Sequence, residues 1–135
     1  MIYLDSSALM KVVRDEAETA AMAGWLAARP DEGTVTSELG RIEVFRAARR
    51  VGPEALAEAH IVIGDVDLVP MSATVQDLAC DIGEVTLRTL DAIHLASAVL
   101  LRGALTAFVT YEQRLLVGAA DLDLPIVAPG REPSA

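Results

Sequence analysis

Five short apolar runs, separated by segments with helical patterning, constrain the fold of this chain more than any other feature. The runs are expected to form strands over residues 2–4, 34–36, 66–69, 107–110 and 125–127. Helices are expected over residues 6–13, 17–28, 38–50, 54–63, 73–81, 90–102 and 111–119. Short strands joined through helices imply right-handed crossovers and a parallel sheet. The sequence therefore predicts a single three-layer α/β domain, with a sheet of about five strands and helices on both faces.

Serine and threonine residues stand where several of these helices are expected to begin. A hydroxyl at that position can accept a hydrogen bond from a free N–H group of the first helical turn. We expect such caps at Ser6 or Ser7, Ser37, Ser72 and Thr89. The expected boundaries therefore agree with local chemistry as well as with the apolar pattern.

The length of 135 residues is that of one domain, and 53% hydrophobic residues are enough to bury one sizeable core. We expect residues 1–130 to form this domain, with Trp25 and Leu26 in its core, and residues 131–135 to form a frayed tail. The single cysteine, Cys80, excludes an intrachain disulfide and fits a reducing cytoplasm. Free cysteines are usually packed in the interior, so Cys80 is expected to be buried.

No segment has the pattern of a membrane anchor. The longest nearly apolar stretch, residues 92–101, contains His94 and Ser97 and falls short of the roughly 20 residues that a span needs. The first residues carry an acid and no basic leader, which argues against a secretion signal. We therefore expect a cytoplasmic protein that does not enter the membrane.

The formal net charge of −9 argues against a generic nucleic-acid binder, because contacts to phosphate depend on Lys and Arg. Two interpretations of the acidic residues remain open. They can form an ordinary solvated surface, or some of them can gather to hold cations that then bridge to phosphate. The charge also suits a basic protein partner.

Four carboxylates are expected at one end of the sheet, because the carboxyl ends of parallel strands share an edge. They are Asp5 after the first strand, Glu43 after the second, Asp91 in the first turn of a later helix, and Glu112 after the fourth strand. Taken singly, Asp91 and Glu112 can be ordinary first-turn acids that the helix dipole favours, and Glu43 can be solvated. Asp5 resists this explanation, because a carboxylate after a buried strand is costly unless it is paired or metal-bound.

Several carboxylates that converge without cationic partners repel one another, so such a cluster requires hard cations. Mg²⁺ and Mn²⁺ prefer oxygen ligands and keep several waters. No spacing of Cys and His residues in this sequence is typical of zinc. An all-oxygen site suits phosphodiester hydrolysis, because the metal lowers the pKa of a bound water and neutralises charge on the phosphoryl oxygens.

The four acids lie in four segments of distinctive sequence. These are Ile2-Tyr3-Leu4-Asp5-Ser6-Ser7-Ala8-Leu9, Thr36-Ser37-Glu38-Leu39 leading to Glu43, Leu90-Asp91-Ala92-Ile93-His94-Leu95-Ala96, and Phe108-Val109-Thr110-Tyr111-Glu112-Gln113-Arg114-Leu115. In order, spacing and total length they resemble the motifs of the PIN-domain family, and most of all the VapC-like toxins of bacterial toxin–antitoxin pairs. Each motif is weak singly, but the four together cover almost the whole chain.

This resemblance implies an endoribonuclease that cleaves structured RNA with Mg²⁺ or Mn²⁺, and it makes Asp5, Glu43 and Asp91 metal ligands. It also implies a homodimer and a cognate antitoxin that inserts a segment at the active site. The family usually has Asp at the fourth position, where this chain has Glu112. We count Glu112 as a catalytic residue and ligand as well, although its carboxylate reaches one methylene further.

Other polar residues are expected around these acids. Ser6 and Thr110 are expected to support the site, although Thr110 can equally be an ordinary strand-end residue. His94 lies one turn after Asp91 and suggests a general base, but a core or hydrogen-bonded role is expected. Arg46 and Arg50 lie within about 60° of Glu43 on a helical wheel. They are expected to contact RNA phosphate or the antitoxin, with salt bridges to nearby acids as the alternative.

Two other functions compete with the toxin-type ribonuclease. A catalytically weak PIN scaffold that binds RNA or protein is favoured by Glu112 and the acidic charge. A phosphoryl-transfer domain with a nucleophilic aspartate at Asp5 is less consistent with the sequence. A phosphatase of the haloacid-dehalogenase type would have a second Asp at the position of Ser7. A response-regulator receiver would have a lysine after a late strand, and Lys11 is the only lysine.

Overall fold

The structure, a computed structural model, describes residues 1–131 and has one five-stranded sheet in the order β3-β2-β1-β4-β5. The strands are β1 (Ile2–Leu4), β2 (Thr34–Ser37), β3 (Asp67–Val69), β4 (Ala107–Val109) and β5 (Ile126–Val127). All neighbouring strands pair in parallel. Because β1 is the central strand, the residue that follows it lies at the middle of the carboxyl edge of the sheet.

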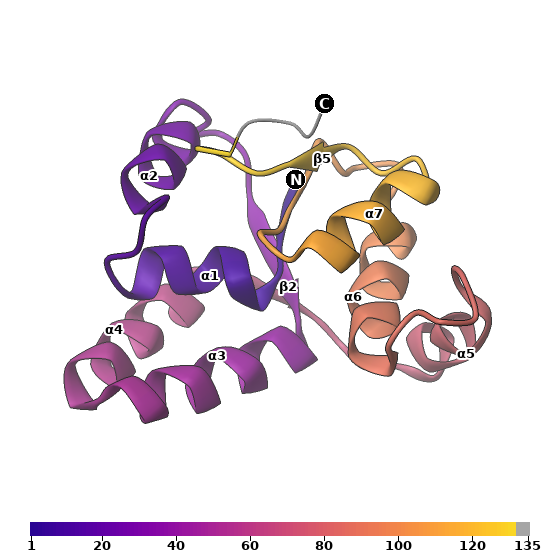
Figure 1. Cartoon of the computed structure of the whole chain (residues 1–135), viewed down its shortest axis with the longest axis horizontal. Coiled ribbons are helices and arrows are strands. Elements are labelled where there is room, and N and C mark those ends of the chain that lie inside the picture. The colour runs from indigo at the N-terminus through magenta and orange to yellow at the C-terminus, as the bar shows by residue number, and fades with distance from the viewer. Residues whose placement is uncertain (132–135) are drawn as a thin grey trace.

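Helices cover both faces of this sheet. They are α1 (Ser6–Val13), α2 (Thr19–Ala27), α3 (Glu38–Val51), α4 (Pro53–Gly64), α5 (Ala73–Asp81), α6 (Thr89–Leu100) and α7 (Gln113–Asp121). Figure 1 shows α1 to α4 on one side of the strands and α5 to α7 on the other. The predicted three-layer α/β fold with a parallel sheet is confirmed. Within residues 1–131, no helix is both long enough and apolar enough to cross a membrane.

The side chains of the central strands alternate between two hydrophobic cores. In β1, Ile2 and Leu4 pack into the core formed with α1 to α4, whereas Tyr3 packs into the core on the side of α6 and α7. In β4, Phe108 lies on the same side as Tyr3, and the two rings stack with centroids 5.1 Å apart. Because both faces of these strands are buried, their sequences are continuously apolar rather than alternating.

Two expected helix caps are confirmed and two are wrong. The hydroxyls of Ser37 and Ser72 accept first-turn N–H groups at the starts of α3 and α5. Helix α1 is capped by Asp5 rather than by a serine, and α6 begins at Thr89 itself without a side-chain cap. A carboxylate accepts hydrogen bonds as well as a hydroxyl does, so the earlier residue takes the capping position in α1.

Two expectations about burial need correction, and one about the domain boundary stays untested. In α2 the fully buried side chain is Met22, while Trp25 and Leu26 are half-buried and pack against the edge of the core. Cys80 is exposed rather than buried. The expected domain boundary at residue 130 stays a prediction, and of the expected tail over 131–135 all but the first residue lie outside the described part of the chain.

Candidate active site

The carboxylate of Asp5 lies at the centre of the candidate site and is only 2% exposed. Its Oδ1 accepts hydrogen bonds from the Ser7 hydroxyl at 2.7 Å and the Ala8 N–H at 2.8 Å. Its Oδ2 accepts from the Thr110 hydroxyl at 2.5 Å. Burial raises the pKa of Asp5 despite these donors and the nearby His94. The groups around Asp5 therefore leave its negative charge incompletely compensated, and a further cation would stabilise the ionised form.

The hydroxyls that hold Asp5 also hold the segment after β4. Ser7 Oγ accepts the N–H of Tyr111 at 2.9 Å, and Thr110 Oγ1 accepts the N–H of Glu112 at 3.1 Å. These bonds keep both residues out of a helix, so α7 begins two positions later than expected. Ser6, expected to support the site, makes no side-chain hydrogen bond within the described residues. The sequence did not single out Ser7 as a supporting residue, although its hydroxyl donates to Asp5.

Glu43 is held by a buried histidine. The Nε2 atom of His94 lies 2.7 Å from Glu43 Oε1, and its Nδ1 atom lies 2.7 Å from the hydroxyl of Tyr3. Burial raises the pKa of Tyr3 far above its usual range, so the hydroxyl keeps its proton and can donate it to Nδ1. Nε2–H is then left to donate to Glu43. The expected hydrogen-bonded core role of His94 is confirmed. The role of Tyr3 was not predicted, because this residue belongs to an apolar strand.

Asp91, in the first turn of α6, has a carboxylate oxygen that lacks a hydrogen-bond donor. This atom, Oδ2, is buried, and no described residue donates to it. Its nearest cation is Arg114, whose Nε atom lies 3.8 Å away, beyond hydrogen-bond length. Leaving a buried acceptor unsatisfied costs about 1–3 kcal/mol, and more for a charged group. Asp91 therefore marks a second point where the site has excess negative charge.

Glu112 differs from the other three acids. It occupies the residue before α7, is exposed, and makes no side-chain cap to that helix. Its backbone is nevertheless anchored to the site through the Thr110 hydroxyl. Glu112 thus lies at the exposed rim of the site. Its side chain is one methylene longer than that of the Asp usual in the family.

His94 lies among the three inner acids, Asp5, Glu43 and Asp91. It is bonded to Glu43, it lies near Asp5, and it follows Asp91 by one helical turn. As the side chains stand, no three Asp, Glu, His or Cys residues within 1–131 form a group that could hold a metal ion. Glu43 faces His94 and Asp91 faces Arg114 instead. These donors are carboxylate oxygens, which a hard cation prefers. Asp91 would have to turn from Arg114 to reach such an ion, whereas Glu43 can offer its second oxygen while Oε1 stays on His94.

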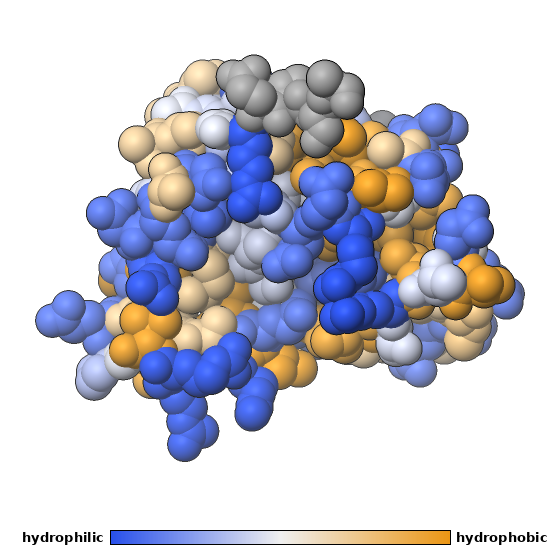
Figure 2. All heavy atoms as spheres, viewed as in Figure 1, coloured by the Kyte–Doolittle hydropathy of each residue, from blue (hydrophilic) through white to orange (hydrophobic). Residues whose placement is uncertain are grey.

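Arg46 and Arg50 are exposed on α3, about one and two turns after Glu43. Arg46 and Arg50 form no ion pair with any residue of the described chain, so the expected alternative of salt bridging is not observed. Figure 2 shows hydrophilic side chains over the middle of this face, between the two groups of helices. The face that carries the acids is thus open to a polar partner.

Comparison with known proteins gives close relatives over the whole chain. A family model described as the PIN domain matches residues 2–120. Ribonuclease VapC47 of Mycobacterium tuberculosis (strain CDC 1551 / Oshkosh) is 43% identical over 133 residues, which cover 96% of this chain and 98% of that protein. Ribonuclease VapC35 of the same strain is 42% identical over 133 residues, covering 97% and 98%. The region matched by the family model includes every candidate acid.

Solved structures share the fold at lower identity. Mycobacterium tuberculosis VapC20, described as a sarcin–ricin loop cleaving toxin, has a TM-score of 0.71 at 19% identity and covers 96% of this chain and 100% of its own. FitAB bound to an IR36 DNA fragment has a TM-score of 0.74 at 15% identity, covering 99% of each chain. A toxin–antitoxin complex from Klebsiella pneumoniae has a TM-score of 0.73 at 18% identity, covering 98% and 100%. At these identities the likeness concerns the fold alone.

Proposed function

The chain belongs to the PIN domain family, and from this premise we propose that it is a metal-dependent endoribonuclease and the toxin of a toxin–antitoxin pair. Two relatives that match it almost end to end, at 42% and 43% identity, are named ribonucleases. Identity at this level over the full length supports a shared reaction, because the segments that carry the acids are matched in both.

Uncompensated negative charge at the carboxyl edge of the sheet carries the proposal. Asp5 is buried with a raised pKa, and Asp91 has a buried oxygen without a donor. A divalent ion held by Asp5, Glu43 and Asp91, with Glu112 at the rim, would compensate this charge. Mg²⁺ and Mn²⁺ suit such oxygen donors. When bound, an ion of this kind lowers the pKa of a bound water and neutralises charge on phosphoryl oxygens.

The other residues of the site are proposed to position these acids. Ser7 and Thr110 fix the orientation of the Asp5 carboxylate by donating to both of its oxygens. His94 orients Glu43 from α6. The exposed guanidinium groups of Arg46 and Arg50 are proposed to contact RNA phosphates or the antitoxin, since they are free of ion pairs within the described residues. In this proposal the acids hold the metal ion, and the exposed arginines contact RNA or the antitoxin.

The partners and setting follow from the same proposal. A net charge of −9 favours a basic antitoxin, because opposite charges accelerate and select association. Toxin–antitoxin complexes among the proteins of the same fold support a protein partner of this type. A homodimer, which the resemblance to VapC-like toxins implies, is also part of the proposal. A cytoplasmic location is part of it as well, since the proposed substrate is RNA.

A cleavage assay tests this function. Structured RNA is incubated with the protein in Mg²⁺, in Mn²⁺ and in EDTA, and compared with Asp5→Asn and with Asp77→Asn, a matched change at an exposed acid on α5. We expect cleavage with either metal, none in EDTA or with Asp5→Asn, and full activity for Asp77→Asn. Undiminished cleavage by Asp5→Asn, or in EDTA, would contradict the proposal.

The scaffold alternative has one observation in its favour. No group of acids within 1–131 is arranged to hold a metal as the side chains stand. If the scaffold is correct, RNA stays intact with the wild type at every metal concentration, and calorimetry with Mn²⁺ shows no binding. Either result separates the two functions, because the ribonuclease requires both cleavage and metal binding.

A further inference from the structure

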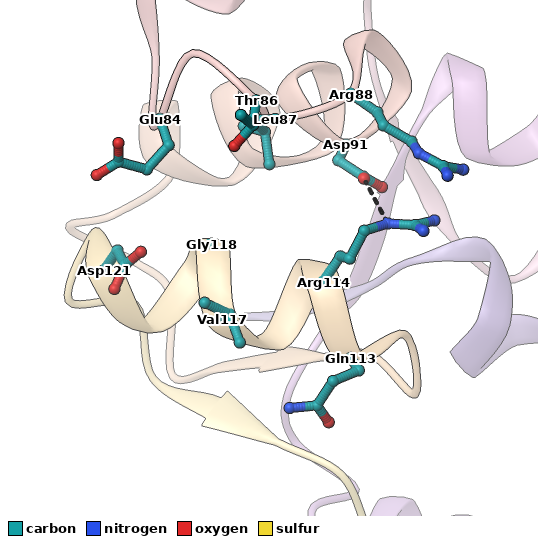
Figure 3. A pocket seen from close by; sticks show the side chains of 11 residues that line it. Glu84, Thr86, Leu87, Arg88, Asp91, Gln113, Arg114, Val117, Gly118 and Asp121 are labelled. Atoms are coloured by element: carbon teal, nitrogen blue, oxygen red, sulfur yellow. Dashed lines mark ion pairs between the residues drawn. The ribbon is translucent and has the colours of Figure 1, made fainter.

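A pocket of about 260 Å³ opens beside Asp91, between the loop that precedes α6 and helix α7. Figure 3 shows Arg88 and Arg114 at the end of the pocket that contains Asp91, with Arg114 reaching toward the carboxylate. The Arg114 side chain is 57% exposed, and its only ion pair within the described residues is the 3.8 Å contact with Asp91. Arg114 is therefore free to turn toward an anion placed next to Asp91.

The rest of the pocket has a different character. Its middle is formed by Leu87, Val117 and Gly118, and its far end carries the acids Glu84 and Asp121. The lining thus changes from two arginines around Asp91 at the active-site end, through apolar side chains, to two acids at the far end. A complementary ligand is anionic at one end, has a flat or apolar body, and carries hydrogen-bond donors at the other.

A nucleotide has this distribution. Its phosphate is anionic, its base is flat, and some bases carry N–H donors on the edge remote from the sugar. Sequence-specific RNA recognition usually takes unstacked single bases, holds them on apolar or guanidinium surfaces and reads their edges by hydrogen bonds. The pocket volume lies just below the range of drug-sized sites, which suits one base.

We propose that this pocket binds one unpaired base of the RNA substrate and selects a base with donors on its Watson–Crick edge, guanine above all. The proposal rests on the proposed ribonuclease function, because the pocket shares Asp91 with the active site. Guanine presents two adjacent N–H donors that one carboxylate can accept together. Uracil presents a single N–H between two carbonyl oxygens, which the carboxylates of Glu84 and Asp121 repel.

A protein segment fits this pocket less well. A basic antitoxin would bring positive charge to the end that already carries Arg88 and Arg114. An acidic or apolar segment would face Glu84 and Asp121 at the other end. The RNA satisfies both ends because its charge is confined to the phosphate.

Binding measurements on an inactive protein test the base preference without relying on cleavage. The probes are five-nucleotide RNAs of uridine in which the central base is G, A, C or U, and the protein carries Asp5→Asn so that the RNA stays intact. Fluorescence anisotropy is expected to show about tenfold tighter binding of the G probe than of the all-U probe. The A and C probes, with one exocyclic amine each, are expected to lie between. Equal affinities for the four probes would overturn the proposal.

Two variants assign the preference to the pocket. Glu84→Gln with Asp121→Asn is expected to remove the G preference, whereas Asp123→Asn, an exposed acid outside the pocket, is expected to keep it. Val117→Trp fills the pocket and is expected to weaken all probes, whereas Ala120→Trp, exposed on the same helix but outside the lining, is expected not to. Unchanged RNA binding by Val117→Trp would overturn the proposal and leave the pocket to a protein partner.

The experiments distinguish refutation of the base pocket from refutation of the ribonuclease function. A wild type that cleaves RNA, combined with an Asp5→Asn protein that binds all probes equally, refutes the base pocket and keeps the ribonuclease. A wild type that cleaves nothing, combined with a G preference that the pocket variants remove, refutes the ribonuclease and keeps the pocket as part of a binding module.

Discussion

The Nε2 atom of His94 lies 2.7 Å from Oε1 of Glu43, and this contact joins α6 to α3 across the candidate site. The other ring nitrogen of His94 is held by the hydroxyl of Tyr3 on β1, also at 2.7 Å. The orientation of one acid therefore depends on three elements that are far apart in the sequence. Because His94 is only 3% exposed, these two partners rather than water fix the orientation of its ring.

Tyr3→Phe is expected to disturb the site from within the core. The ring remains stacked on Phe108, but Nδ1 of His94 loses its partner, which costs about 1–3 kcal/mol of unfolding free energy. Because His94 can then take other orientations, Mn²⁺ affinity is expected to fall as well. Urea unfolding and a Mn²⁺ titration measure the two effects.

Tyr111→Phe is the matched control for this change. It removes a hydroxyl that donates to the Pro129 carbonyl at 2.8 Å, away from His94. We expect it to lower stability while leaving Mn²⁺ affinity unchanged. If both tyrosine variants alter Mn²⁺ affinity equally, His94 does not position Glu43.

Gly40→Ala is expected to push α3 away from the sheet. A methyl group at this buried position, one turn before Glu43, would overlap the Thr36 hydroxyl and lie 3.4 Å from Cε1 of His94. Such overpacking costs about 1–3 kcal/mol. Gly24→Ala on α2 meets nothing within 4 Å and is expected to add about 0.5–1 kcal/mol instead. Urea unfolding of the two variants checks the opposite signs, and destabilisation by both would contradict this packing.

The strands and the positions of the acids could be predicted from the sequence, because they depend on local patterns. Runs such as residues 2–4 are apolar throughout since both faces of the strand are buried, and topology then places Asp5 at the sheet edge. Partners set by packing were not predictable in this way. Tyr3 and His94 are 91 positions apart, and no pattern in β1 marks one of its three buried residues as a hydrogen-bond donor.

The same limit applies to the support of Asp5 and Asp91. Thr110 could be named from the resemblance of its segment to a PIN-domain motif, but the choice of Ser7 over Ser6 depends on the direction of the first turn of α1. The approach of Arg114 to Asp91 depends on how α7 packs beside α6. The sequence thus predicts which carboxylates share a metal, and this stays a prediction, whereas the groups that hold them in the structure were not predictable.

Glu112→Asp tests the exposed acid at the rim. The glutamate makes no cap to α7, whereas a shorter aspartate can accept a first-turn N–H group. We expect a gain of up to about 1 kcal/mol in unfolding free energy. Glu112→Gln, which keeps the length, is expected to change stability by less than about 0.5 kcal/mol. RNA cleavage should fall less with Glu112→Gln than with Asp5→Asn, and the reverse order would place Glu112 at the centre of the site.

The stability of the protein is expected to fall in acid partly through Glu18. Hydrogen bonds from Lys11, at 2.8 Å, and from Arg131 lower the pKa of Glu18 from 4.5 to about 2. A pKa that is lower in the folded state gives stability that is full above pH 4.5 and lost as the pH falls toward 2. Glu18→Gln should flatten this part of the curve of unfolding free energy against pH. An unchanged slope between pH 4.5 and 2 would contradict the pairing.

Sharing of one divalent ion by Asp5, Glu43 and Asp91 is tested most directly by an anomalous difference map from crystals soaked in Mn²⁺. We predict a peak within bonding distance of carboxylate oxygens from all three residues, with Glu43 still held by His94 through Oε1 and Asp91 released from Arg114. A fully soaked crystal that shows no peak there, with the pair of Asp91 and Arg114 still in place, would contradict this prediction.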